Sequence, residues 1–202
     1  MLGLPKQTEI KRQLSKSAIY SKFQMNNVQK EKIDADISKM VIVNEILPST
    51  VSIAAGNNVQ AFFVVNVILK RKDYDEKSII AISKLISQNL LFALECEEEI
   101  RLAVYHSKLI QSEWQSKENV KIELKGLDLD GVWENVIKQI GDIQVTQGNT
   151  LDEQIAIDDK KMRLEKEIAR LEKQARNEKQ PKKKFELVQC INKFKQELSS
   201  LT

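Results

Sequence analysis

Two apolar stripes with the spacing of a coiled coil lie in the C-terminal part of the chain, and they constrain its fold more than any other feature. The members of the first stripe lie alternately four and three residues apart: Ile157, Lys161, Leu164, Ile168, Leu171 and Ala175. The members of the second stripe follow the same rule: Leu187, Ile191, Phe194 and Leu198. Side chains at these intervals share one face of an α-helix. The pattern therefore predicts two helices, each with one narrow apolar stripe.

A proline and three lysines separate the two stripes and predict a turn between the helices. Pro181 cannot lie inside a helix, because it lacks an N–H group and its ring crowds the preceding turn. Further back, Thr150 and Glu153 have the spacing of a capping box, which begins a helix. An antiparallel helical hairpin is the favoured arrangement, and one kinked coiled coil is the alternative.

Each stripe needs a surface to cover it, because isolated helices of this length are only marginally stable in water. The other helix, a second copy in a homodimer, or a different protein would each serve. The stripe residues that we predict to bind a partner are Leu164, Ile168, Leu171, Leu187, Ile191, Phe194 and Leu198. We also assign Phe185 to the helical stripe, and not to a surface on which bases stack.

The charge of the chain is divided between an acidic body and a basic extension. From Lys160 to Lys184, eleven Lys and Arg residues stand against four Glu residues, whereas residues 1–159 carry a net charge of −4. We therefore expect a body over residues 1–148 and a basic helical extension over residues 149–202. The candidates for phosphate contacts are Lys179, Lys182, Lys183 and Lys184 at the turn, with Arg163, Arg170 and Arg176 before it. A solvated helix face paired with its own glutamates is the alternative.

The body has the pattern of an α+β domain. In its first part we expect a helix that Asn27 caps and that ends near Ser38, a strand Met40–Leu47, a short strand Val51–Ile53 and a strand Phe62–Leu69 covered on both faces. In its second part we expect a helix opened by Asp73 and Asp75, strands Leu90–Leu94 and Ile100–Tyr105, an edge strand Val120–Leu124, and a helix that Asp130 caps and Gly141 ends. Consecutive strands without helical crossovers predict an antiparallel or mixed sheet with flanking helices.

Composition excludes several classes of protein. The best apolar run, Ala61–Leu69, is less than half of the roughly 20 residues that a membrane-spanning helix needs. The two cysteines, Cys96 and Cys190, and the single histidine, His106, are too few for a zinc site. None of the six glycines falls in a phosphate-binding loop pattern. We therefore expect a cytoplasmic protein with no membrane association, no metal and no cofactor.

A metal-dependent nuclease is the one enzyme class for which the chain offers candidates. Such a site uses carboxylates to hold Mg²⁺ and a lysine to orient the attacking water. Lys70 ends the central strand and Glu45 lies on a neighbouring strand, but Ile68 stands where a second acid should be. Glu123 and Lys125 have the right spacing but come late in the chain. The pattern is incomplete, so the sequence favours a protein without a catalytic site.

A cluster of glutamates is the best candidate for binding a hard cation. Glu95, Glu97, Glu98 and Glu99 lie between two predicted strands. Adjacent carboxylates attract Ca²⁺ or Mg²⁺. A solvated hairpin tip is the simpler interpretation, and we assign no metal to it.

Six segments in order carry a resemblance to a known family. They are Leu4-Pro5, the segment Ile42–Ile53, Leu69-Lys70 before Asp75-Glu76-Lys77, Leu91–Glu95, Trp133-Glu134, and Ile168–Gln174. Over nearly its whole length the chain resembles the bacterial domain-of-unknown-function family four-three-nine-one. Members of that family are often encoded beside helicase-like ATPases, DNA methyltransferases and restriction subunits. The resemblance implies a role in restriction or anti-phage defence, and it supplies no catalytic residues.

These observations together lead to one expected function and two alternatives. We expect a non-catalytic accessory or adaptor subunit that docks onto a larger helicase, methyltransferase or nuclease-type protein through its helical extension. One alternative is a divalent-metal nuclease that uses Glu45 and Lys70. The other is a direct, non-specific nucleic-acid binder that uses the basic turn.

Overall fold

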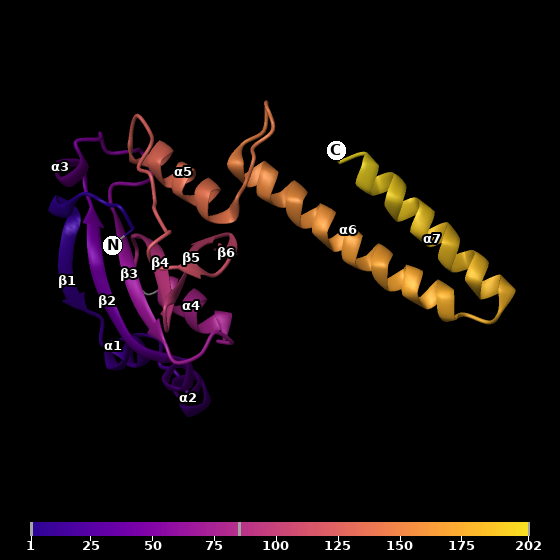
Figure 1. Cartoon of the computed structure of the whole chain (residues 1–202), viewed down its shortest axis with the longest axis horizontal. Helices are drawn as coiled ribbons and strands as arrows, with labels where there is room; N and C mark the ends of the chain where they lie inside the picture. The colour runs from indigo at the N-terminus through magenta and orange to yellow at the C-terminus, as the bar shows by residue number, and fades with distance from the viewer. Residues whose placement is uncertain (1, 85, 202) are drawn as a thin grey trace. The chain divides into compact units, whose positions relative to one another are not determined.

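A computed structural model describes residues 2–84 and 86–201 of the chain (Figure 1). The chain divides into two compact units between Ile143 and Gln144. We call the N-terminal part the sheet unit and the C-terminal part the hairpin unit. Among the helices in the described ranges, none is both long and apolar enough to cross a membrane.

The sheet unit alternates short helices with the strands of one sheet. In chain order its elements are η1 (Lys6–Thr8), β1 (Glu9–Gln13), α1 (Lys16–Lys22), α2 (Asn27–Asp36), β2 (Ile37–Ile46), α3 (Pro48–Val51), β3 (Phe62–Leu69), α4 (Glu76–Ser83), β4 (Asn89–Cys96), β5 (Glu99–His106), β6 (Lys108–Gln111), β7 (Gln115–Ser116) and α5 (Leu129–Gly141).

The sheet is mixed, and its strands β1 to β6 lie side by side in chain order, with β7 paired to β5. Strands β3 and β4 run parallel, and α4 makes the crossover between them. The other paired strands run antiparallel. A mixed sheet with flanking helices confirms the α+β class that the sequence predicts.

Helices cover both faces of β3, which explains why its sequence is almost continuously apolar. On one face Val65 and Val67 are buried in a core that also receives Ile19 of α1, Ile33 of α2 and Ile79 of α4. On the opposite face Phe62 meets Trp133 of α5, with 5.0 Å between the ring centroids. The two cores fix α4 and α5 on opposite sides of the sheet.

The predicted strand Val51–Ile53 is wrong, because this segment belongs to the short helix α3 and the turn after it. Pro48 is the first residue of α3, a position where its fixed φ and missing N–H favour a helix start. Ser52 then ends the helix in the left-handed region, with φ 55°. A three-residue alternation is too short to outweigh these local preferences.

The predicted edge strand Val120–Leu124 is also wrong, since these residues form no strand. The side-chain amide of Gln139 in α5 takes the place of a partner strand. Its oxygen accepts from the Glu123 N–H at 3.0 Å, and its NH₂ donates to the Glu123 carbonyl at 2.8 Å. A side chain from a distant helix thus satisfies the backbone that a strand ladder would otherwise pair.

Two helix caps lie one or two residues before the predicted positions. Asn26, rather than Asn27, caps α2. Asp128, rather than Asp130, caps α5, and its side chain accepts from the Gly131 N–H at 2.8 Å. The Asp130 carboxylate instead accepts from backbone N–H groups of the loop 57–59. It therefore holds this loop against the start of α5.

The hairpin unit consists of α6 (Leu151–Asn177) and α7 (Pro181–Ser199). The capping box at Thr150 and Glu153 is confirmed, because each residue bonds the backbone N–H of the other. Pro181 is the first residue of α7. Helices α6 and α7 pack together as an antiparallel hairpin, which is the arrangement that the sequence favours (Figure 1).

Candidate functional site

The two apolar stripes meet each other inside the hairpin. Ile168 and Leu171 of α6 form a buried cluster with Ile191 of α7. The cluster also contains Ala175, and three further residues of the second stripe pack against it half-buried: Leu187, Phe194 and Leu198. Leu164 is buried as well. The residues that we predicted to bind a partner therefore lie along the seam between α6 and α7, where each helix covers the other.

Two ion pairs join the helices across the seam. The Lys160 ammonium lies 2.8 Å from the Glu197 carboxylate, and the Lys195 ammonium lies 2.7 Å from that of Glu172. The second pair lowers the pKa of Glu172, chiefly through the hydrogen bond from Lys195. These contacts join Lys160 and Glu172, twelve residues apart in α6, to the C-terminal half of α7.

The outward side of α7 exposes apolar side chains. Phe185 is 64% exposed and Val188 is 40% exposed. Phe185 precedes the seam residue Leu187 by two positions, which is roughly 200° around the helix, so its assignment to the stripe is wrong. We call the exposed, uncharged residues of this side the outer face of α7: Phe185, Val188, Gln189, Asn192 and Gln196.

The outer face of α7 is not among the surfaces that we predicted from the sequence. Its successive members lie three, one, three and four residues apart, so they share one face of the helix as those of the seam do. This second series is the signal that identifies the face. It was easily overlooked because only Phe185 and Val188 in it are apolar.

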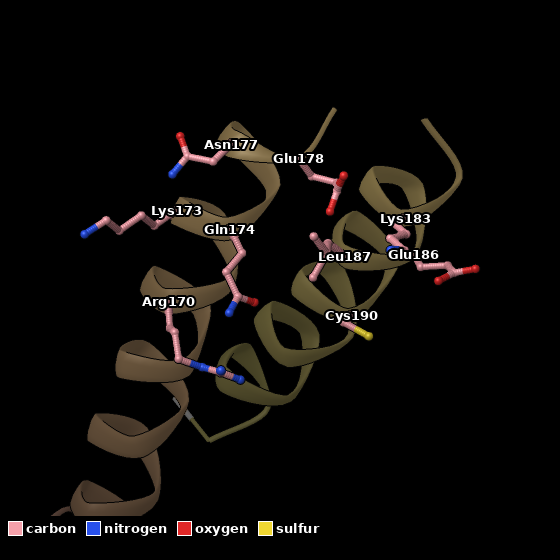
Figure 2. Close-up of a pocket in the computed structure, with 9 residues that line it drawn as sticks. All are labelled: Arg170, Lys173, Gln174, Asn177, Glu178, Lys183, Glu186, Leu187 and Cys190. Atoms are coloured by element: carbon pink, nitrogen blue, oxygen red, sulfur yellow. The ribbon is translucent and has the colours of Figure 1, made fainter. Parts of the chain in front are cut away.

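A groove of about 880 Å³ opens between α6 and α7 near their turn (Figure 2). Figure 2 shows Gln174 and Leu187 pointing into the gap between the helices, with the Arg170 guanidinium reaching toward α7. Lys173, in contrast, points away from α7. We call this hollow the tip groove. Its lining contains no aromatic side chain among the residues described.

Six exposed cations lie around the same end of the hairpin, and we call them the tip cations: Lys173, Arg176, Lys179, Lys182, Lys183 and Lys184. Within the described ranges, none of them forms an ion pair with a carboxylate. Residues 173–184 hold one acid, Glu178, and so carry a net charge of +5. The positive charge at this end of the hairpin is therefore largely uncompensated.

The two residues of the nuclease alternative do not share a site. Glu45 of β2 pairs with Phe63 at the start of β3, whereas Lys70 directly follows the end of β3. Seven residues of strand, or about 23 Å, separate Phe63 from Lys70. The Lys70 ammonium instead donates to the backbone carbonyl of Asp34 at 2.6 Å.

The glutamate cluster is engaged by neighbouring cations and an amide. The Glu95 carboxylate lies 2.7 Å from the Lys117 ammonium and accepts from the Asn66 side chain at 3.1 Å. Burial opposes ionisation of Glu95, but these two donors outweigh it and lower its pKa. Glu99 pairs with Lys72. Across residues 2–84 and 86–201, no group of three or more acids, histidines or cysteines is placed to hold a metal ion.

Comparison with known proteins assigns the chain to a family. A search of curated proteins and a search of solved structures each returned no match. A family model matches residues 2–198, which is nearly the whole chain and includes both units. The chain therefore belongs to the family described as Domain of unknown function (DUF4391).

Proposed function

We propose that this protein is a non-catalytic accessory subunit whose hairpin unit docks onto a larger protein that acts on DNA. The observation that carries the proposal is the exposure of Phe185 and Val188 on the outer face of α7. The seam beneath them is already covered by α6. A helix that exposes apolar side chains on the side opposite its own packed seam is suited to bind another helix or groove.

The composition of the outer face supports protein docking further. Acidic and basic residues of α7 flank this face but do not interrupt it between Phe185 and Gln196. Depletion of charge at the centre and enrichment in aromatic residues distinguish the cores of protein interfaces from the remaining surface. Phe185 is the natural anchor, because buried aromatic side chains contribute much of the binding energy at such interfaces.

The kind of partner rests on the family resemblance rather than on geometry. Genes for helicase-like ATPases, DNA methyltransferases and restriction subunits often accompany this family. A partner from one of these classes places the protein in restriction or antiviral defence. The hairpin would then act as the arm by which the sheet unit is attached to the complex.

The test is affinity purification of the full chain from its native host, with identification of the proteins retained. We compare wild type with Phe185→Ser/Val188→Ser, and use Met162→Ser as the control because Met162 is a 44% exposed apolar residue of α6. Retention of a DNA-acting protein by wild type and control, with loss in the double variant, supports the proposal. Retention by all three proteins contradicts it.

A second copy of the chain is the competing occupant of the outer face. Sedimentation of the purified full chain over a range of concentrations separates the two cases. A dimer that dissociates on Phe185→Ser/Val188→Ser substitution would assign the face to self-association and contradict docking of a different protein.

A further inference from the structure

A row of basic side chains continues from α6 to the tip cations. Arg163, Lys166, Arg170 and Lys173 are exposed and recur three, four and three residues apart, so they form one line along α6. At a rise of about 1.5 Å per residue, this line is about 15 Å long. The tip cations extend it around the turn. The positive charge is therefore arranged as a track rather than as a single point.

Ion pairs with glutamates neutralise some cations of the hairpin but leave most of this track unpaired. Lys160 and Lys195 each pair with a glutamate across the seam. Arg170 pairs with Glu167 through two hydrogen bonds, and the track residues beyond it have no ion pair in the described part of the chain. Exposed like charges repel each other, so a cluster of this kind destabilises the free protein unless an anion offsets it.

We propose that the basic track of α6 and the tip cations bind the phosphate backbone of a nucleic acid without reading its sequence. A linear polyanion, with one charge per roughly 3.4 Å along each strand, places phosphates along the whole track. A single small anion would engage only one part of it. This proposal concerns a different surface from the outer face of α7 and does not depend on the protein partner.

The tip groove points to backbone contacts rather than to base recognition. Its described lining has no aromatic side chain on which a base stacks. It offers instead the Arg170 guanidinium and the amide of Gln174, beside the carboxylates of Glu178 and Glu186 (Figure 2). Guanidinium and amide N–H groups can donate hydrogen bonds to phosphate oxygens. Phosphate contacts fix the position of a protein on nucleic acid but carry no sequence information.

The distribution of apolar residues argues against a membrane surface as the polyanion. A helix that lies on a membrane has its cations beside the apolar face that enters the lipid. Here Phe185 and Val188 lie on the side of α7 away from α6, whereas Lys173 points away from α7. The basic track of α6 therefore lies on the opposite side of the hairpin from Phe185 and Val188.

The test is the affinity of the full chain for a fluorescent DNA duplex of about 20 base pairs and mixed sequence, measured by anisotropy from about 50 to about 200 mM salt. We compare wild type with Lys182→Gln/Lys183→Gln/Lys184→Gln. The control is Lys6→Gln/Lys39→Gln/Lys77→Gln, which removes the same charge from exposed positions of the sheet unit. Circular dichroism verifies that both variants keep their helices.

We expect the tip variant to bind about tenfold more weakly at low salt and to lose about 2–3 from the slope of log K against log salt. The control should stay within about twofold of wild type. An RNA duplex in place of DNA identifies which nucleic acid binds more tightly, and tight binding of either one supports the proposal. Equal losses in the two variants, or binding to phosphatidylserine vesicles without binding to either duplex, would overturn it.

Discussion

Asp130 occupies the space that a Cβ atom on Gly56 would need. Such an atom would lie only 2.6 Å from the Asp130 backbone nitrogen, and it would also meet the carboxylate. That carboxylate accepts from the Asn57 N–H at 2.8 Å and from the Val59 N–H at 2.6 Å. Glycine is therefore required at this position by the close approach of the loop to the start of α5.

Replacement of Gly56 by alanine should destabilise the sheet unit by about 1–3 kcal/mol, since overpacking forces backbone shifts at both segments. Urea unfolding, followed by the fluorescence of Trp114 and Trp133 in the sheet unit, measures this loss. Gly131→Ala is the matched control, because an added Cβ there has its nearest neighbour at an ordinary 3.5 Å. Unfolding of the two variants at the same urea concentration would show that Gly56 tolerates a Cβ atom.

The stability of the sheet unit should depend on the ionisation of Asp130. Partial burial opposes its charge, but the N–H groups of Val59, Asn58 and Asn57 outweigh that effect and lower the pKa of Asp130. An unfolded chain, with an ordinary pKa of about 3.9, therefore binds this proton at a higher pH than the folded chain does. The stabilisation is present above about pH 4 and is lost as the pH falls toward the folded-state pKa.

The comparison of wild type with Asp130→Asn checks this dependence. Their difference in urea midpoint should be constant above about pH 5 and should shrink as the pH falls below about 4. Asparagine keeps the shape of the side chain, removes its charge and replaces one accepting oxygen with an NH₂ group, and the loss of that acceptor does not depend on pH. A difference that stays constant down to about pH 3 would show that the loop is not held by the charged carboxylate.

Loss of the Asp36 carboxylate should destabilise the sheet unit far more than loss of the Asp34 carboxylate. Asp36 is buried at 1% exposure, and its carboxylate accepts from Arg71 Nε at 2.7 Å and from the Asp75 N–H at 2.8 Å. Asp36→Ala should cost about 1–3 kcal/mol, because it leaves these donors without their acceptor. Asp34→Ala should cost less than about 1 kcal/mol, because the Asp34 side chain is 54% exposed. Thermal unfolding of both variants measures the two losses of stability. Similar losses would contradict the structural role of the buried Asp36 carboxylate.

The hairpin unit and the sheet unit should unfold in separate transitions. Ile191 is 6% exposed, and Ile191→Ala should destabilise the hairpin by about 2–5 kcal/mol. Helical circular dichroism should then fall at a lower temperature. Both tryptophans, Trp114 and Trp133, lie in the sheet unit, so their fluorescence transition should not move.

Val188→Ala provides the control for this prediction. Val188 is 40% exposed on the outer face of α7, so its truncation should change the stability of the hairpin by about 0.5 kcal/mol or less. If Val188→Ala were as damaging as Ile191→Ala, the seam would not be the main source of stability in the hairpin. If the fluorescence transition moved with the dichroism, the two units would unfold together.

Features that depend on nearby residues were predictable from the sequence. The capping box at Thr150, the helix start at Pro181 and the two apolar stripes each involve residues within a few turns of one another. The continuous apolar run of β3 likewise indicated burial on both faces. Propensity and periodicity act over this range, and they predicted both the class of the sheet unit and the hairpin.

Features that depend on distant residues were not predictable. The side chain of Gln139 takes the place of a partner strand for the Glu123 backbone. The local sequence around Glu123 does not indicate this contact, because Gln139 lies in a helix further along the chain. The same holds for Asp130, which resembles a helix cap but bonds a loop more than 70 residues earlier. The heptad spacing of the two stripes is also the same whether the stripes pack against each other or against a partner, so it could not distinguish these arrangements.

The order of the strands has a consequence for how the protein is made. Because β1 to β6 are neighbours in space in the same order as along the chain, each strand after β1 can pair with a strand that the ribosome has already synthesised. No early strand has to wait for a late one to fill a gap in the middle of the sheet. Biosynthesis can thus extend the sheet one strand at a time, which shortens the period in which its growing edge is open to aggregation.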